Sequence, residues 1–187
     1  MKWDIRDFTP ALLEDYIRFF DKEAQYDKPE WEGCRCIHFH LNAVYEAAYK
    51  AGTPFDEISR DILNKGLVRG HLAFSDGKII GWVNTNDKSA YDRLLADGAL
   101  WADDKPKTKA AVCFLVRPDM RRQGIAAALL AHAVAKARQE GYAVFEGYPA
   151  VEDCDEYEAH HGTVDMFEKQ GFVRVEQNGR VLMRKVL

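Results

Sequence analysis

The chain has 187 residues, of which 47% are hydrophobic, and its formal net charge is -4. This length suits one compact core, so we expect a single domain over residues 1–187. The charge lacks the basic excess typical of nucleic-acid binders, and no apolar run approaches the roughly 18 residues of a membrane span. Residues 1–7 mix both charges without the apolar stretch of a signal peptide. We therefore expect a cytoplasmic protein with neither nucleic-acid nor membrane partners.

Four cysteines occur in the chain: Cys34, Cys36, Cys113 and Cys154. They do not form the dense framework of a small disulfide-rich protein, and a chain of this size does not need one. We therefore expect four reduced thiols.

The first third of the sequence predicts two strands and two helices. Residues 3–8 suit a short strand, and a helix over residues 9–20 follows it. The Thr9-Pro10 pair supplies an N-cap and a first helical residue. Residues 36–40 alternate in polarity, which favours a second strand. A second helix is expected over residues 54–66.

The middle of the sequence contains the clearest hairpin. Ser75-Asp76-Gly77-Lys78 separates two apolar runs, and Asp-Gly readily adopts the positive φ angles of a tight turn. The hairpin is expected over residues 71–83, with helical structure over residues 88–96. Residues 110–116 are almost wholly apolar, which indicates a central strand covered on both faces.

The last third predicts a long helix, a strand, a short helix and a second hairpin. These are expected over residues 122–139, 142–145, 163–170 and 172–185, and a glycine ends each helix. The long helix has an apolar face. That face consists of Ile125, Leu129, Leu130, Ala133, Val134 and Ala137. The whole order predicts an α/β protein, a mixed sheet with helices on both faces.

The segment between residues 112 and 126 joins the buried strand to the long helix. A helix start presents N–H groups without intrahelical partners, together with positive potential, so it suits a phosphate. Gly124 lets a ligand approach the backbone, and Ala126 is also small. No acidic residue occurs over residues 121–139, and Arg121 and Arg122 add positive charge. The segment therefore predicts an anion site.

This segment resembles the pyrophosphate loop of the GCN5-related N-acetyltransferase (GNAT) superfamily. The family pattern, Q/R-x-x-G-x-G/A after a strand, is met by Arg121-x-x-Gly124-x-Ala126. Residues 166–172, Met-Phe-Glu-Lys-Gln-Gly-Phe, resemble the family's short helix and following strand. The resemblance covers residues 70–187 well and residues 1–70 in general layout. It implies a strongly twisted mixed sheet, flanked by helices and splayed at its central strands.

The resemblance also implies acetyl-CoA as cosubstrate, with its pyrophosphate on the loop and its pantetheine arm along the central strand. An amine would then attack the thioester directly, without a covalent enzyme intermediate. The residues expected to contact the cofactor are Phe114, Leu115, Val116, Arg121, Arg122, Gln123, Gly124, Ile125, Ala126, Ala127 and Phe167.

The acetyl transfer needs groups that move protons, because an alkylamine is mostly protonated at pH 7. Many members of the family have a tyrosine acid where this chain has Phe167, which cannot donate a proton. We expect Glu146, at the end of the cleft-facing strand, to act as the base. Tyr148 is the first candidate for the acid. The others are Tyr157, His160 and His161.

The run Cys34-x-Cys36-x-His38-x-His40 allows three interpretations: an acceptor-site lining, core packing or a metal site. Alternate positions of one strand cannot surround a metal tetrahedrally, so we expect no metal there. Residues 152–158 hold five acids, which could attract a cationic amine. The residues expected at the acceptor site are Trp31, Cys34, Cys36, His38, Asn84 and Tyr157.

The sequence thus predicts an N-acetyltransferase that acts on a primary amine of a small molecule or a protein, as a monomer or a homodimer. The alternative is an acyl-CoA-binding sensor or regulatory domain without catalysis, which Phe167 favours. A third reading is a metal-binding protein that uses the Cys/His run.

Overall fold

The computed structural model describes residues 3–28, 34–96, 107–149, 158–177 and 180–187. Seven strands form one sheet in the order β1-β2-β3-β4-β5-β7-β6. They are β1 (Asp4–Asp7), β2 (Gly70–Ser75), β3 (Lys78–Asp87), β4 (Thr108–Val116), β5 (Val144–Gly147), β6 (Val173–Gln177) and β7 (Arg180–Val186). Only β4 and β5 pair in parallel; the other five pairs are antiparallel. The mixed sheet expected from the sequence is confirmed.

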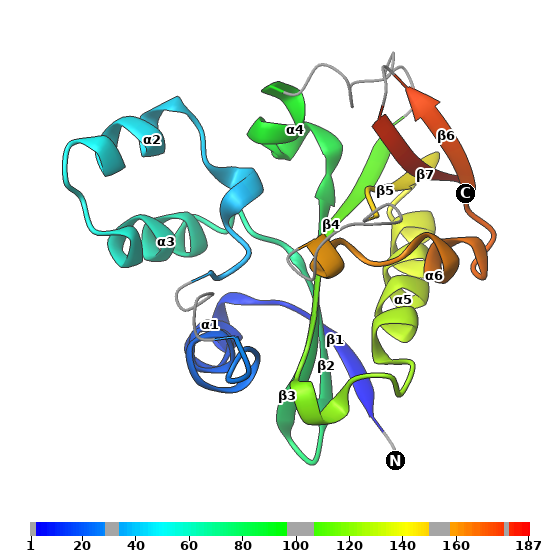
Figure 1. Ribbon diagram of the computed structural model, residues 1–187, viewed down its shortest axis with the longest axis horizontal. Helices are drawn as coiled ribbons and strands as arrows, with labels where there is room; N and C mark the ends of the chain where they lie inside the picture. Colours follow the sequence, from blue (N-terminus) through cyan, green and yellow to red (C-terminus); the bar gives the residue numbers. More distant parts are fainter. Residues whose placement is uncertain (1–2, 29–33, 97–106, 150–157, 178–179) are drawn as a thin grey trace.

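Helices cover both faces of the sheet (Figure 1). The α-helices are α1 (Leu13–Arg18), α2 (Ala43–Lys50), α3 (Phe55–Asn64), α4 (Asp92–Ala96), α5 (Ile125–Gln139) and α6 (Val164–Glu168). Short 3-10 helices are η1 (Pro10–Leu12), η4 (His38–His40), η5 (Lys88–Ala90), η6 (Pro118–Met120) and η7 (Glu158–His161), and η2 (Phe19–Glu23) is a π-helical turn. In Figure 1, α1, α2 and α3 lie on one side of the sheet, and α5 and α6 on the other.

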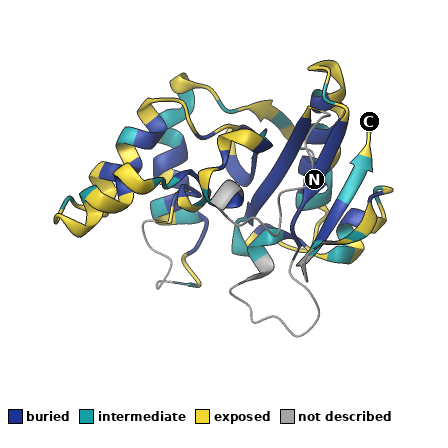
Figure 2. Cartoon of the chain, turned by 90° about the horizontal axis from the view of Figure 1, so that it is seen from above, coloured by how far each residue is buried: buried dark blue, intermediate teal, exposed yellow. Residues whose placement is uncertain are grey.

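Two hydrophobic cores result from this layering, because successive side chains of a strand point to opposite faces. Leu72 belongs to the core under α1 and α3, whereas its neighbour Ala73 belongs to the core under α5. The apolar face expected for the long helix is buried residue for residue, from Ile125 to Ala137. The central strands are dark blue in Figure 2, and α2 and α3 expose most of their outer surface.

Two irregularities in β4 shape the centre of the sheet. Asn84 pairs with Cys113 and the next residue of β3, Thr85, pairs with Ala111, so Val112 forms a β-bulge. The pairing of β4 with β5 ends at Ala111 opposite Gly147, although β4 continues to Val116. The central strands therefore separate there, as the resemblance implied.

Most of the predicted elements are present, and α5 begins three residues later than expected. The φ angles of Arg122 and Gly124 are 60° and 84°, and such left-handed backbone cannot belong to a right-handed helix. The first helix is built from η1, α1 and η2 and reaches Glu23, and the Thr9 side chain makes no capping hydrogen bond.

The strand predicted for residues 36–40 is wrong. Cys36 has a φ angle of 54°, and residues 38–40 form η4, so the backbone is not extended there. The prediction also omitted α2, although Asn42 is a strong local signal. The Asn42 side chain caps this helix by accepting hydrogen bonds from the backbone of Val44 and Tyr45.

Candidate active site

The separated edge of β4 carries the residues expected along the pantetheine arm. Phe114 and Leu115 are 5% and 6% exposed and belong to opposite cores, and Val116 is half-buried. All three follow Ala111, the last residue of β4 that pairs with β5. Beyond that point one edge of β4 offers its N–H and C=O groups to something other than β5.

The start of α5 lies next along the chain, after η6. Gln123 and Gly124 are exposed, and the first helical turn contains no acidic side chain. In the described part of the chain, nothing lies within 4 Å of the position that a Cβ on Gly124 would take. The first N–H groups of α5 therefore face open space with positive potential, which fits a phosphate group.

The two arginines of this loop have different surroundings. Arg121 donates to Asp27 and, at 3.1 Å, to the Val116 carbonyl oxygen, so part of its charge is already balanced. Arg122 is exposed beside Gly124. Within the loop, Arg122 is thus the better placed of the two to meet an external anion.

The remaining residues expected at the cofactor are partly or fully covered. Ile125 is 1% exposed in the core, Ala126 and Ala127 are half-buried, and the Ala127 carbonyl accepts a hydrogen bond from Gln170 at 2.7 Å. Phe167 is fully buried. Its ring covers Gly147 so closely that a Cβ there would collide with it. Phe167 thus packs in the core beneath the cleft.

Glu146 lies at the centre of a buried polar cluster. Its side chain is 0% exposed, and its Oε1 accepts from Arg184 Nε at 2.8 Å. Its Oε2 accepts from the Tyr148 hydroxyl at 3.0 Å and from Lys88 Nζ at 2.9 Å. Glu146 and Arg184 are register partners across β5 and β7. The structure thus brings the two predicted proton-transfer residues together, but both carboxylate oxygens already accept from other groups.

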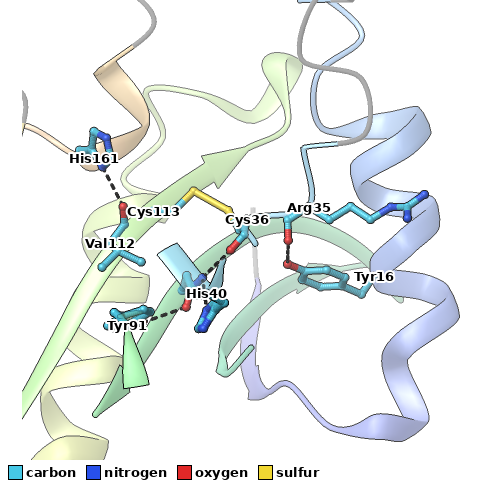
Figure 3. Close-up of a disulfide and its surroundings, with 9 residues drawn as sticks. Tyr16, Arg35, Cys36, His40, Tyr91, Val112, Cys113 and His161 are labelled. Carbon is cyan, nitrogen blue, oxygen red and sulfur yellow. Dashed lines mark hydrogen bonds between the residues drawn. A yellow bond between two sulfur atoms is a disulfide. The ribbon is translucent and has the colours of Figure 1, made fainter. Parts of the chain in front are cut away.

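In the core under α1 and α3, Cys36 and Cys113 form a disulfide across 77 residues of chain (Figure 3). The expectation of four reduced thiols is therefore wrong for these two cysteines. Sequence spacing could not reveal the bond, because it depends on how the loop after residue 33 folds over β4. Cys34 is a free, exposed thiol.

A buried amide anchors the same loop. Asn84 is fully buried; it donates to the Cys36 carbonyl oxygen at 2.9 Å and accepts from the Tyr91 hydroxyl at 2.9 Å. His40 Nε2 lies 3.4 Å from the Asn84 amide nitrogen. Burial lowers the pKa of His40 to about 4, so this imidazole is neutral at pH 7. Asn84, expected at the acceptor site, thus ties the loop to the sheet.

His38 belongs to a more exposed cluster beside this loop. Its Nε2 lies 2.8 Å from Arg93 Nη1, and Arg93 also donates to Glu46 at 2.9 Å. Burial and the Arg93 charge lower the pKa of His38. Trp31 and Tyr157, together with residues 152–156, lie outside the described residues.

His161 comes from η7 and lies against the bulge of β4. Its Nδ1 is 2.8 Å from the Val112 carbonyl oxygen (Figure 3). A carbonyl oxygen only accepts, so Nδ1 carries the proton and, in the neutral ring, Nε2 carries the lone pair. The ring of Phe39, from η4, lies 5.8 Å from that of His161. An imidazole with a defined tautomer is therefore present where β4 and β5 separate.

Sequence reasoning missed several residues of this site. Lys88 was expected only as part of a helical stretch, yet it is 2% exposed and pairs with Glu146. Arg184 lies opposite Glu146 only because β5 pairs with β7, and no local pattern encodes that pairing. The Val112 bulge and its contact with His161 left no local signal.

A mixed sheet that separates beside β4, next to an open helix start without acidic side chains, is the arrangement expected of an acyl-CoA-dependent transferase. The model of the acetyltransferase (GNAT) family matches residues 9–172, and the chain belongs to this family. Its acyl donor is acetyl-CoA, and it transfers acetyl groups. No curated protein matches the sequence.

Solved structures share the fold. The PaiA N-acetyltransferase of Thermoplasma acidophilum, in complex with coenzyme A, is 15% identical over 100% of both chains, with a TM-score of 0.54. The GNAT domain of PAT from S. lividans is 20% identical over 98% of this chain and 89% of that one, with a TM-score of 0.54. The ribosomal-protein-alanine N-acetyltransferase of Brucella melitensis is 16% identical over 98% and 99%, with a TM-score of 0.52. Among the described residues, no helix is both long and apolar enough to cross a bilayer.

Proposed function

We propose that this protein is an N-acetyltransferase that acetylates a primary amine of a small molecule or a protein, with both substrates meeting where β4 and β5 separate. One observation carries the proposal: β4 runs past its last β5 partner, Ala111, and leads directly to the open start of α5 at Gly124. Acetyl-CoA supplies the acetyl group as a thioester. The first N–H groups of α5, with Arg122, bind its pyrophosphate.

For proton removal from the amine, we prefer His161 to Glu146, because His161 is half-buried whereas the Glu146 side chain is 0% exposed. Both oxygens of Glu146 accept from buried donors, so an amine could reach one only by displacing a partner. The Val112 carbonyl holds His161 with its proton on Nδ1, and Nε2 then accepts the proton of the amine. We assign Glu146 to holding the Tyr148 hydroxyl. Tyr148 remains our candidate acid for the leaving thiolate, and to act it must turn its single hydroxyl proton away from Glu146 Oε2.

The experiment compares two glycines that flank the same helix. Gly124 and Gly141 have φ angles of 84° and 74°, and neither has a described atom within 4 Å of its Cβ position. Leucine therefore costs similar backbone strain at both positions, but only Gly124 lies at the anion site. In calorimetric titrations with CoA and desulfo-CoA, we expect Gly124→Leu to weaken both by roughly a hundredfold. Gly141→Leu should bind like the parent protein.

A CoA-release assay with a panel of amines then tests the transfer itself. Turnover with at least one amine supports the enzyme, whereas tight CoA binding without turnover over the whole panel would favour the acyl-CoA sensor. Unchanged affinity in Gly124→Leu would overturn the placement of the pyrophosphate.

A further inference from the structure

Three side chains with metal-binding atoms meet on the α5 face of the sheet, away from β5. Asp7 on β1 and His71 on β2 are register partners, and His132 reaches them from α5. One ligand atom from each residue lies within 4.8 Å of the other two. These residues are far apart in the sequence, so no motif announces the cluster.

The distances match the spacing of ligands around one ion. Asp7 Oδ1 is 3.0 Å from His71 Nδ1 and 3.7 Å from His132 Nε2. Two ligand atoms about 2.0–2.1 Å from a tetrahedral zinc ion are about 3.3 Å apart, between these two values. The third separation, between the two imidazoles, is at most 4.8 Å, so an ion that binds all three atoms draws the two rings closer together.

The histidines are held in place without full hydrogen bonding. The His71 side chain is 6% exposed. His132 Nε2 is buried and has no hydrogen-bond partner among the described residues. A buried imidazole nitrogen without a hydrogen-bond partner destabilises the folded protein unless a ligand binds it. A metal ion would satisfy this nitrogen and Asp7 Oδ1 together.

The surroundings provide an orienting partner and access. Lys136 Nζ contacts the other oxygen of Asp7, Oδ2, at 3.0 Å, so Oδ1 faces the histidines. A cavity of about 460 Å³ borders Asp7 and His71 and gives an ion and its water a route to the cluster. The Lys136 charge also opposes a cation, so its removal changes two contributions of opposite sign.

We propose that Asp7, His71 and His132 bind one divalent transition-metal ion, of which zinc is the best fit, and thereby clamp α5 to the β1–β2 edge of the sheet. Two imidazoles and one carboxylate suit zinc, cobalt and nickel, with a water in the fourth position. The site is separate from the acetyl-transfer site, so the test of metal binding does not depend on the proposed reaction.

The test uses the full-length chain without a histidine tag, stripped with EDTA and titrated calorimetrically with zinc chloride. We expect one equivalent to bind and the melting temperature to rise. His132→Gln and Asp7→Asn should each lower the zinc affinity by on the order of tenfold or more. His38→Gln removes an exposed histidine elsewhere, and Cys34→Ser removes the free thiol; both should bind like the parent.

Cobalt gives an independent readout, because a tetrahedral ion shows intense visible absorption that His132→Gln should abolish. Zinc affinity that is the same in the parent and in both ligand variants would overturn the proposal, as would the absence of stoichiometric binding to the parent. His132 lies on a half-exposed helix position, so its variant should fold.

Discussion

The cofactor side and the acceptor side of the cleft are held together differently. On the cofactor side, the proposed anion site consists of neighbouring backbone groups between Met120 and Ala127, among them Gly124 with its φ angle of 84°. On the acceptor side, each important contact joins distant parts of the chain. Cys36 reaches Cys113 across 77 residues, Asn84 reaches Cys36 across 48, and His161 reaches Val112 across 49.

This difference means that cofactor binding depends on backbone groups, whereas acceptor binding depends on particular side chains. A helix start binds a phosphate through backbone groups, which most side chains near it leave intact. An acceptor pocket depends on side chains that tertiary contacts position. Changes on the acceptor side should therefore alter turnover or stability while cofactor affinity stays the same.

The largest expected effect is on turnover, from His161→Gln. Loss of a positioned proton acceptor costs 10²–10⁴-fold, so we expect kcat to fall by about a thousandfold, or about 4 kcal/mol of barrier. CoA affinity should not change. The neighbouring His160→Gln is the matched control and should retain activity. If His161→Gln keeps a normal kcat and the same fall in kcat at low pH as the parent, the base assignment returns to Glu146.

The next effect is on stability, from Glu146→Gln. The substitution removes the carboxylate that pairs with Lys88, itself 2% exposed, and breaking a buried pair in this way costs about 3 kcal/mol. Urea unfolding measures the loss. Glu140→Gln is the control, because Glu140 is 46% exposed where it pairs with Lys109, and such a pair is worth less than about 1 kcal/mol. Equal losses of unfolding free energy in the two variants would mean that the buried ion pairs of Glu146 contribute no more to stability than the exposed pair of Glu140.

The same division decided how much could be predicted from the sequence. The hairpin at Asp76-Gly77 and the buried face of α5 depend on local patterns, and both were predicted correctly. The region around η4 was not, because the alternation of residues 36–40 imitates a strand while the Asn84 contact and the Cys36 backbone impose a turn. The Lys88 and Arg184 partners of Glu146 require the sheet order, which local patterns do not encode.

The smallest expected effect concerns pH and the anchor of the acceptor loop. His40 has a folded-state pKa of about 4, below the ordinary value of 6.5, so the unfolded chain binds its proton first. Above pH 6.5 the imidazole is neutral in both the folded and the unfolded chain, so its pKa shift does not affect the free energy of unfolding. As the pH drops from 6.5 towards 4, the unfolded chain takes up the proton and the folded protein loses stability. Between pH 8 and pH 5 this single group should remove about 2 kcal/mol.

Urea unfolding of the parent and of His40→Gln at both pH values isolates this contribution, since the variant should lose less stability on acidification. The more exposed His38→Gln should show a smaller difference, because burial is the main cause of the His40 shift. If His40→Gln loses as much stability as the parent, the imidazole is not held neutral beside Asn84. The disulfide of Cys36 would then be the main anchor of this loop. Low pH would in that case not destabilise the acceptor side more than the cofactor side.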